Sequence, residues 1–266
     1  QGGRVPAKVY PATPSPNPTH TLSSDCGESA GFTLTHFQTQ ALPSPNSPTA
    51  VMSSPLVIAL RFAGLLCLGI AQGAAAEAEL REGAERALQQ SPLSVTHKNV
   101  VSPSGDPRDY VSTAPYFWPD PNQPDGLPYI RRDGEVYPGS RTDESDFVRS
   151  RTLSRTVDSL VRAYRKTGEE TYAAHAALLL RTWFIESATA MNPHLDFAQG
   201  IPGVNTGRRF GIIEGTSLVS ALENAGRLVG SPAWTDTDHA ALLRWADAFL
   251  DWYLTSQFGL EEADMH

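Results

Sequence analysis

The sequence predicts an all-α domain of antiparallel helical hairpins joined by long loops rich in proline and glycine. Apolar residues recur at helical spacing in five separate segments, and short turn-forming stretches at 167–169 and 230–235 join two pairs of them. Long irregular stretches separate the pairs. This pattern favours an incomplete toroid of α/α hairpins, although a helix bundle or a helical-repeat solenoid would show it too.

The first two helices are defined by their apolar positions. A short helix is predicted over 79–90, where Leu80, Ala84 and Leu88 share one face and Ser91-Pro92 ends the pattern. A long amphipathic helix is predicted over 143–167, with apolar residues on one face and arginines on the others.

The remaining three helices complete the two hairpins. A third helix over 169–185 follows Gly168, which stands where a C-terminal cap belongs, so residues 167–169 should be a hairpin tip. Further helices are predicted over 213–229 and 236–256. Thr235, with an aspartate three residues later, is the N-cap expected for the last one.

Composition divides the chain into three parts. Residues 1–51 hold eight prolines with many serines and threonines and show no regular period, which indicates disorder or a spurious upstream extension. Residues 52–76 have an apolar centre and end in small residues, as a secretory signal peptide does. Residues 77–266 form the predicted helical domain, and because the chain does not begin with methionine we expect a piece of a longer protein.

The signal predicts a secreted protein, extracellular or periplasmic in a bacterium. Arg61 inside the apolar run keeps a buried helix or a short membrane anchor open as alternatives. The run is shorter than the ~20 apolar residues that span a bilayer, so no stable membrane insertion is expected after signal removal. Both cysteines, Cys26 and Cys67, precede the cleavage point, so the mature part can form no disulfide.

Charge and motifs exclude several functions. The chain carries 21 Lys and Arg against 29 Asp and Glu, a net charge of −8, whereas sequence-independent nucleic-acid binding requires a basic surface. No H-E-x-x-H, P-loop or G-x-G-x-x-G signature occurs, and His97, His175 and His239 lack metal-ligand spacing. We therefore expect no nucleic acid, no metal and no cofactor.

Two loops concentrate polar and aromatic residues. The stretch 98–140 holds eight prolines and four glycines in 43 residues, and the loop 192–214 holds four glycines. Loops of this length are usually functional or disordered. Three motifs, Ser104–Pro121, Leu127–Gly134 and Asn192–Glu214, resemble the alginate lyase family of secreted polysaccharide lyases, and the likeness covers roughly residue 93 to the end.

The resemblance implies an α/α toroid that cleaves alginate or a related uronate polymer by β-elimination, with an anionic polysaccharide as partner. In that family an Asn-Asn-His-Gly type motif follows a tryptophan-rich helix such as 245–253, and a later tyrosine acts as the acid. We expect His266 to lie just before that motif, so the catalytic residues stay unassigned. The chain alone is expected to be inactive and to expose apolar surface around Trp245, Phe249 and Trp252.

β-Elimination requires a group that neutralises the uronate carboxylate, because the proton to be removed lies next to it. Gln199, Asn205 and Arg208 lie in the glycine-rich loop and can donate several hydrogen bonds to one carboxylate. We predict that they bind substrate. Alternatively, an arginine of this loop pairs with Glu214 or Asp196, and Gln199 only holds the loop in place.

The proline-rich loop supplies a second group of candidates. Tyr116 and Trp118 could stack on sugar rings, and Lys98, with Arg131 and Arg132, could form a basic rim that attracts uronates. Lys98, Tyr116 and Trp118 are therefore predicted to bind substrate. The alternative for both aromatic residues is packing of the loop onto the helices.

Two other functions stay open. An inverting glycoside hydrolase on a similar toroid would need two carboxyl groups roughly 6.5 to 9.5 Å apart in one cleft, and Asp196 and Glu214 are the pair to test. A non-catalytic carbohydrate-binding helical domain would bind without turnover. Ultraviolet absorbance distinguishes these classes, because only elimination leaves an unsaturated uronate.

Overall fold

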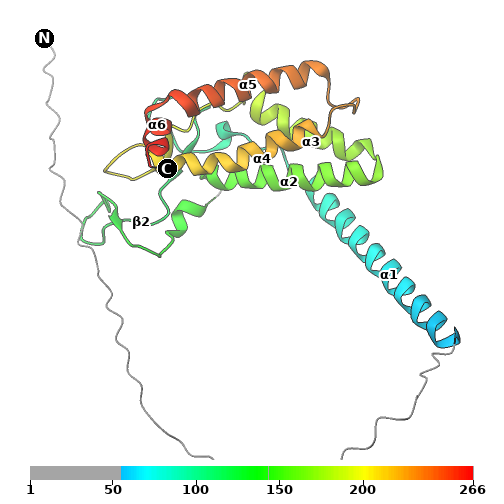
Figure 1. The fold of residues 1–266 in the computed structure, drawn as a ribbon. Coiled ribbons are helices and arrows are strands. Elements are labelled where there is room, and N and C mark those ends of the chain that lie inside the picture. The colour runs from blue at the N-terminus through cyan, green and yellow to red at the C-terminus, as the bar shows by residue number, and fades with distance from the viewer. Residues whose placement is uncertain (1–54, 143, 266) are drawn as a thin grey trace, which may run out of the picture. The chain divides into compact units, whose positions relative to one another are not determined.

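The computed structural model describes residues 55–142 and 144–265, and helices dominate them (Figure 1). This confirms the predicted all-α class, while the toroid stays a prediction. Residues 1–51 and His266 lie outside the described part. Six α-helices occur in that part: α1 Pro55–Leu88, α2 Asp146–Thr167, α3 Glu170–Phe184, α4 Gly215–Gly226, α5 Asp236–Thr255 and α6 Gln257–Ala263.

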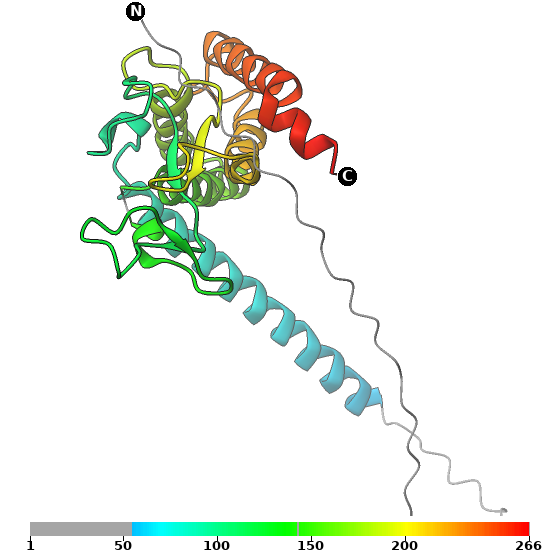
Figure 2. The ribbon, with the colours of Figure 1, turned by 90° about the vertical axis from the view of Figure 1, so that its left-hand side faces the viewer.

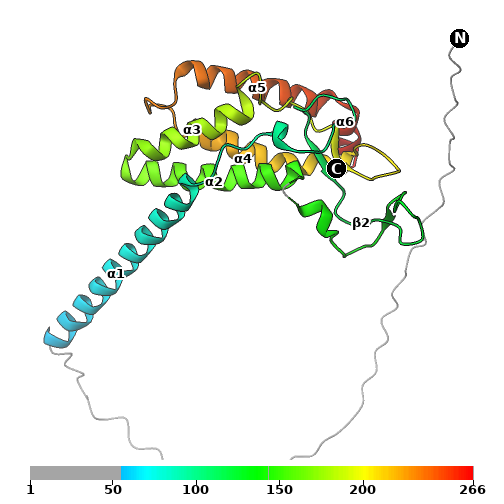
Figure 3. The same cartoon turned by 180° about the vertical axis from the view of Figure 1, so that it is seen from behind.

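Local signals at the helix ends create the hairpins. Gly168 ends α2 in the left-handed conformation, with φ of 74°, and its N–H donates to the Tyr164 carbonyl oxygen, so the chain reverses directly into α3. Thr235 and Asp238 form a reciprocal capping box at the start of α5. The helices α2 to α5 lie side by side in opposite views (Figures 1 and 3).

Helix α1 is longer than predicted. It begins at Pro55 instead of near residue 79, so the end of the predicted signal, residue 76, lies inside a continuous helix. The N-terminal half of α1 extends away from the other helices (Figure 2), whereas Ala84 and Ala87 are buried against them. The alanine-rich sequence after the apolar run favours helix, which explains the continuity. Among the described helices, none is long and apolar enough to cross a membrane.

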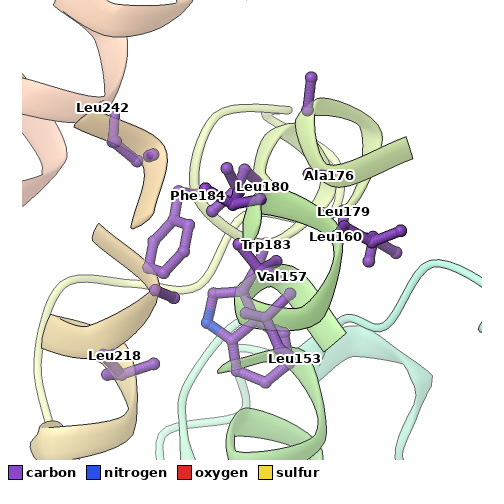
Figure 4. Packing of buried hydrophobic residues seen from close by; sticks show 14 of the residues in the cluster. Leu153, Val157, Leu160, Ala176, Leu179, Leu180, Trp183, Phe184, Leu218 and Leu242 are labelled. Atoms are coloured by element: carbon purple, nitrogen blue, oxygen red, sulfur yellow. The ribbon is translucent and has the colours of Figure 1, made fainter. Parts of the chain in front are cut away.

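The hydrophobic core lies between α2, α3, α4 and α5. Trp183 of α3 is fully buried, with Leu153 and Val157 of α2 beside it and Leu218 of α4 and Leu242 of α5 across from it (Figure 4). Fully burying one such aliphatic side chain contributes about 1.5–3 kcal/mol, so this cluster is a main source of stability.

Helix α5 corrects one expectation. Trp245 and Phe249 are only 7% and 5% exposed, because they pack toward the core and the Trp245 ring lies 4.7 Å from that of Phe184. The expected apolar surface exists, but it lies on other positions of the same helix, including Leu243, Leu250 and Leu254.

Short strands join the two long loops at one end of the helices (Figures 1 and 3). Strand β1, Val111–Thr113, pairs in parallel with β4, Phe197–Gly200, and β2, Phe117–Trp118, pairs antiparallel with β3, Ile130–Arg131. Three 3₁₀ helices complete the loops: η1 Val95–His97, η2 Pro138–Arg141 and η3 Arg209–Glu214. The pairing of β1 with β4 brings the proline-rich loop against the glycine-rich loop.

Candidate functional site

A cavity of about 400 Å³ lies where the two loops meet. Three predicted site residues, Tyr116, Gln199 and Arg208, share it, whereas Lys98, Trp118 and Asn205 do not line it. The wall combines aromatic, charged and amide side chains from separate parts of the chain: Pro115, Tyr116, Phe117, Arg131, Asp133, Gln199, Arg208, Phe210, Ile213 and Glu262.

Glycines let the 200–211 segment fold tightly against β4. A Cβ at Gly207 would overlap the Asp196 carbonyl oxygen, and one at Gly211 would lie 2.6 Å from both the Cβ and the carbonyl oxygen of Ala198. Neither position has room for a side chain. This close approach lets the Arg208 backbone N–H donate to the Ala198 carbonyl oxygen at 3.1 Å, which sets Arg208 at the cavity wall.

Gln199 is held in an unusual backbone conformation. Its φ is 50°, a value uncommon for a residue with a side chain, and only 8% of the residue is exposed. The backbone N–H donates to Ser112 Oγ at 2.8 Å, and the side-chain Oε1 accepts from Arg208 Nη2 at 2.8 Å. Such a conformation persists only where the surroundings enforce it, so both contacts help to fix this residue.

A buried carboxylate lies behind Gln199. Glu214 is 2% exposed, and its Oε2 accepts from Ser112 Oγ at 2.6 Å and from the Tyr110 hydroxyl at 2.9 Å. Burial raises the pKa of the Glu214 carboxyl, while the hydrogen bonds from Ser112 and Tyr110 oppose the rise. Its Oε1 has no close hydrogen-bond partner among the described residues.

Arg208 presents a half-buried cation to the cavity. Its guanidinium carbon lies 5.3 Å from the centre of the Phe117 ring and 5.1 Å from that of Phe210. Burial and then Arg131 lower the Arg208 pKa, and Glu214 opposes them, but an arginine keeps its charge in proteins. The group has five N–H donors and gives one to Gln199, so others can bind an anion.

The other predicted residues have mainly structural contacts. Trp118 Nε1 donates to the Glu135 carbonyl oxygen at 2.9 Å, and its ring lies 5.2 Å from that of Tyr137 and 4.9 Å from the Arg132 guanidinium. Asn205 Oδ1 accepts from the Ile201 N–H at 3.0 Å and closes a turn. By contrast, Tyr116 at the cavity is 42% exposed.

Lys98 lies inside the fold and away from the cavity. Its side chain is 1% exposed and its Nζ lies 3.0 Å from Asp146 Oδ2, while backbone carbonyl oxygens of residues 95 and 109 accept further hydrogen bonds at 2.6 and 2.7 Å. Burial raises the pKa of Asp146 to about 6, although Lys98 opposes this. Lys98 thus fixes the start of the proline-rich loop on α2, and substrate binding by Lys98 stays a prediction that the cavity does not include.

The carboxylate pair considered for a hydrolase does not meet at this cavity. Asp196 Oδ1 accepts from Trp252 Nε1 at 2.9 Å and its Oδ2 lies 3.3 Å from His194 Nδ1, whereas Glu214 is buried behind the wall. Neither residue lines the cavity. In the described part of the chain, no group of three histidine, cysteine or acidic residues could hold a metal ion.

Sequence reasoning missed part of this site. Ser112 and Tyr110 reach Glu214 only because β1 pairs with β4, and strands this short have no recognisable period. Phe210 and Ile213 lie within five residues after Arg208, in η3. Their apolar character close to two arginines was the signal that could have placed them at the cavity.

The comparisons with known proteins agree with the motifs. The family model described as alginate lyase matches residues 94–266. An alginate lyase from Bacteroides ovatus, known from a crystal structure, is 38% identical, with a TM-score of 0.68 over 71% of this chain and 50% of that chain. No curated protein matches. The chain thus spans about half the length of the Bacteroides lyase. Because the family model matches most of this sequence, the chain belongs to the alginate lyase family.

Proposed function

We propose that this chain is the substrate-binding part of a polysaccharide lyase that cleaves alginate or a related uronate polymer by β-elimination. One observation carries the proposal: Arg208, held by Gln199, faces a cavity walled by the rings of Tyr116, Phe117 and Phe210. A guanidinium suits a carboxylate, and aromatic rings suit the faces of sugars. Family membership supports the same reaction.

The reaction explains why a cation is needed there. A base removes the proton from the carbon next to the carboxylate, the bond to the leaving oxygen breaks, a carbon–carbon double bond forms, and the leaving oxygen takes up a proton. Negative charge moves onto the carboxylate in the transition state. Arg208 can stabilise that charge without a change in its own protonation, since it stays charged at the pH values where proteins fold.

The proton-transferring groups form a second part of the proposal. Among the described residues that line the cavity there is no histidine, and the chain spans about half of the Bacteroides lyase. We propose that the chain by itself binds uronate polymers without cleaving them. We also propose export through the signal at 52–76, which would bring the protein to an extracellular polysaccharide.

Binding and cleavage can be tested separately on the purified 266-residue chain. Calorimetry should show that uronate oligomers bind, whereas neutral oligosaccharides of the same length do not. Ultraviolet absorbance should stay flat during incubation with alginate, polyglucuronate or pectate. Equal affinity for neutral and acidic oligomers, or no binding of either, would overturn carboxylate recognition. A rise in absorbance would overturn the proposed inactivity.

A further inference from the structure

We infer that Glu214 is a positioning residue: it fixes the orientation of Gln199, and Gln199 in turn holds Arg208 toward the cavity. The geometric part of this inference is independent of the ligand. Its consequence for uronate binding rests on the proposed function. Glu214 is buried behind the wall and does not line the cavity, so any effect on a ligand must pass through other residues.

The side-chain amide of Gln199 has one chemically consistent orientation. Arg208 can only donate, so the Gln199 atom 2.8 Å from Nη2 must be the oxygen Oε1. Gln199 thereby holds one N–H of the Arg208 guanidinium at the cavity wall.

The main chain of Gln199 is connected to the Glu214 carboxylate through Ser112. Ser112 has a single hydroxyl hydrogen, and at 2.6 Å it is donated to Glu214 Oε2. A lone pair of Ser112 Oγ is therefore free to accept the Gln199 backbone N–H at 2.8 Å. Glu214 thus determines the direction of the hydroxyl that supports Gln199 at its φ of 50°.

The burial of Glu214 needs an explanation beyond packing. Acidic side chains are almost never fully buried unless they are paired, and within the described residues Glu214 has no ion pair closer than 4 Å. Arg141 and Arg208 act on it only at longer range. A packing role alone would be filled at lower cost by an apolar residue. A carboxylate is needed, however, to accept from the Tyr110 and Ser112 hydroxyls together.

The proposal predicts a change in uronate affinity that is opposite in direction to the change expected from the loss of charge alone. Glu214 is negative and lies near Arg208, so removing its charge would make the cavity more positive. If charge were its only influence, the Glu214→Gln variant would bind a uronate more tightly. If Glu214 positions Gln199 and Arg208, the variant should bind more weakly, because its amide can donate to Ser112 Oγ as well as accept from it and no longer fixes the direction of the hydroxyl that supports Gln199.

The experiment compares Glu214→Gln with two further variants. Tyr110→Phe removes one hydrogen bond to the carboxylate and leaves Gln199 and Arg208 untouched. Glu223→Gln, at an exposed position of α4, removes an equal charge as a matched control. The measurements are the NMR signals of the Gln199 backbone amide and the Arg208 guanidinium as a function of pH, and the affinity for a uronate trimer.

In the wild-type protein the Gln199 backbone amide signal should follow the titration of Glu214, because Ser112 Oγ joins the two groups, and in Glu214→Gln this titration should vanish. Uronate affinity should fall about tenfold in Glu214→Gln, as for one misaligned charge-assisted hydrogen bond, and less in Tyr110→Phe. Glu223→Gln should behave as wild type.

Unchanged Gln199 and Arg208 signals in a folded Glu214→Gln variant would overturn the inference, as would unchanged or tighter uronate binding. If the variant does not fold, wild-type signals and wild-type affinity in Tyr110→Phe would overturn it equally. If the wild-type protein shows the amide titration but binds no uronate, the positioning role stands and the proposed ligand fails.

Discussion

Replacing Arg208 with alanine should weaken uronate binding by about 10-fold to 150-fold, the equivalent of ~1.5–3 kcal/mol for one hydrogen bond to a charged group. The upper part of this range applies to a desolvated cation. Arg208 is half-buried between the rings of Phe117 and Phe210, which limits its contact with water. Asp133 and Glu262 on the same wall repel an anion, so we expect a loss of affinity in the lower part of this range.

The assay is calorimetric titration with a uronate oligomer at low salt, with Arg209→Ala as the matched control. Arg209 carries the same charge one residue further along and contacts the Phe210 ring at 4.7 Å, but it does not line the cavity. Its loss should change the affinity less than threefold, a surface-charge effect below about 0.7 kcal/mol. Equal affinities of a folded Arg208→Ala variant and the wild type, or equal losses in both variants, would refute the assignment.

Three further predictions concern the stability of the fold as well as ligand binding. Gly207→Ala should lower the melting temperature and abolish uronate binding, because its Cβ would overlap the Asp196 carbonyl oxygen. Gly226→Ala is the control: this glycine has open space around it, so the substitution should leave the melting temperature unchanged or raise it. Trp118→Ala should lower the melting temperature more than the affinity, since its ring contacts loop residues instead of the cavity; the reverse would make it a sugar contact. Asp238→Asn should cost about 1 kcal/mol or more at pH 7, because Asp238 caps α5 and binds Arg181. The hydrogen bond from Arg181 holds the pKa of Asp238 well below its usual range, so its stabilisation is present above about pH 4 and lost as the pH falls further. Urea unfolding at pH 7 and pH 3 should therefore show a smaller acid-induced loss in Asp238→Asn than in the wild type.

Helix ends could be predicted because their signals are local. Gly168 takes the left-handed conformation that other residues avoid, and Thr235 with Asp238 satisfies the free N–H groups of the next helix. Each signal lies within four residues of the helix end that it defines. The hairpins followed from these ends and from the apolar faces between them.

The site was only partly predictable because its contacts join distant parts of the chain. Residue type and position in the two long loops singled out Tyr116, Gln199 and Arg208, which share the cavity. The buried ion pair of Lys98 with Asp146 could not be found, since a lysine before a polar loop has the same sequence pattern whether it is buried or exposed. Glu214 was considered as a partner for an arginine and as one carboxyl of a hydrolase pair. Its hydroxyl donors could not be recognised, because they lie in and beside a strand far away in the sequence.

The parallel pairing of β1 with β4 has a consequence for how the protein folds. The hydrogen bond between Gln199 and Ser112 joins residues 87 positions apart, and the segment between them includes all of α2 and α3. Contacts of such long sequence separation form slowly, since the loop must close before they contribute. The cavity should therefore be among the last regions to form, after the helical hairpin. A ligand that binds only the finished cavity would slow unfolding and make the midpoint of thermal unfolding depend on ligand concentration.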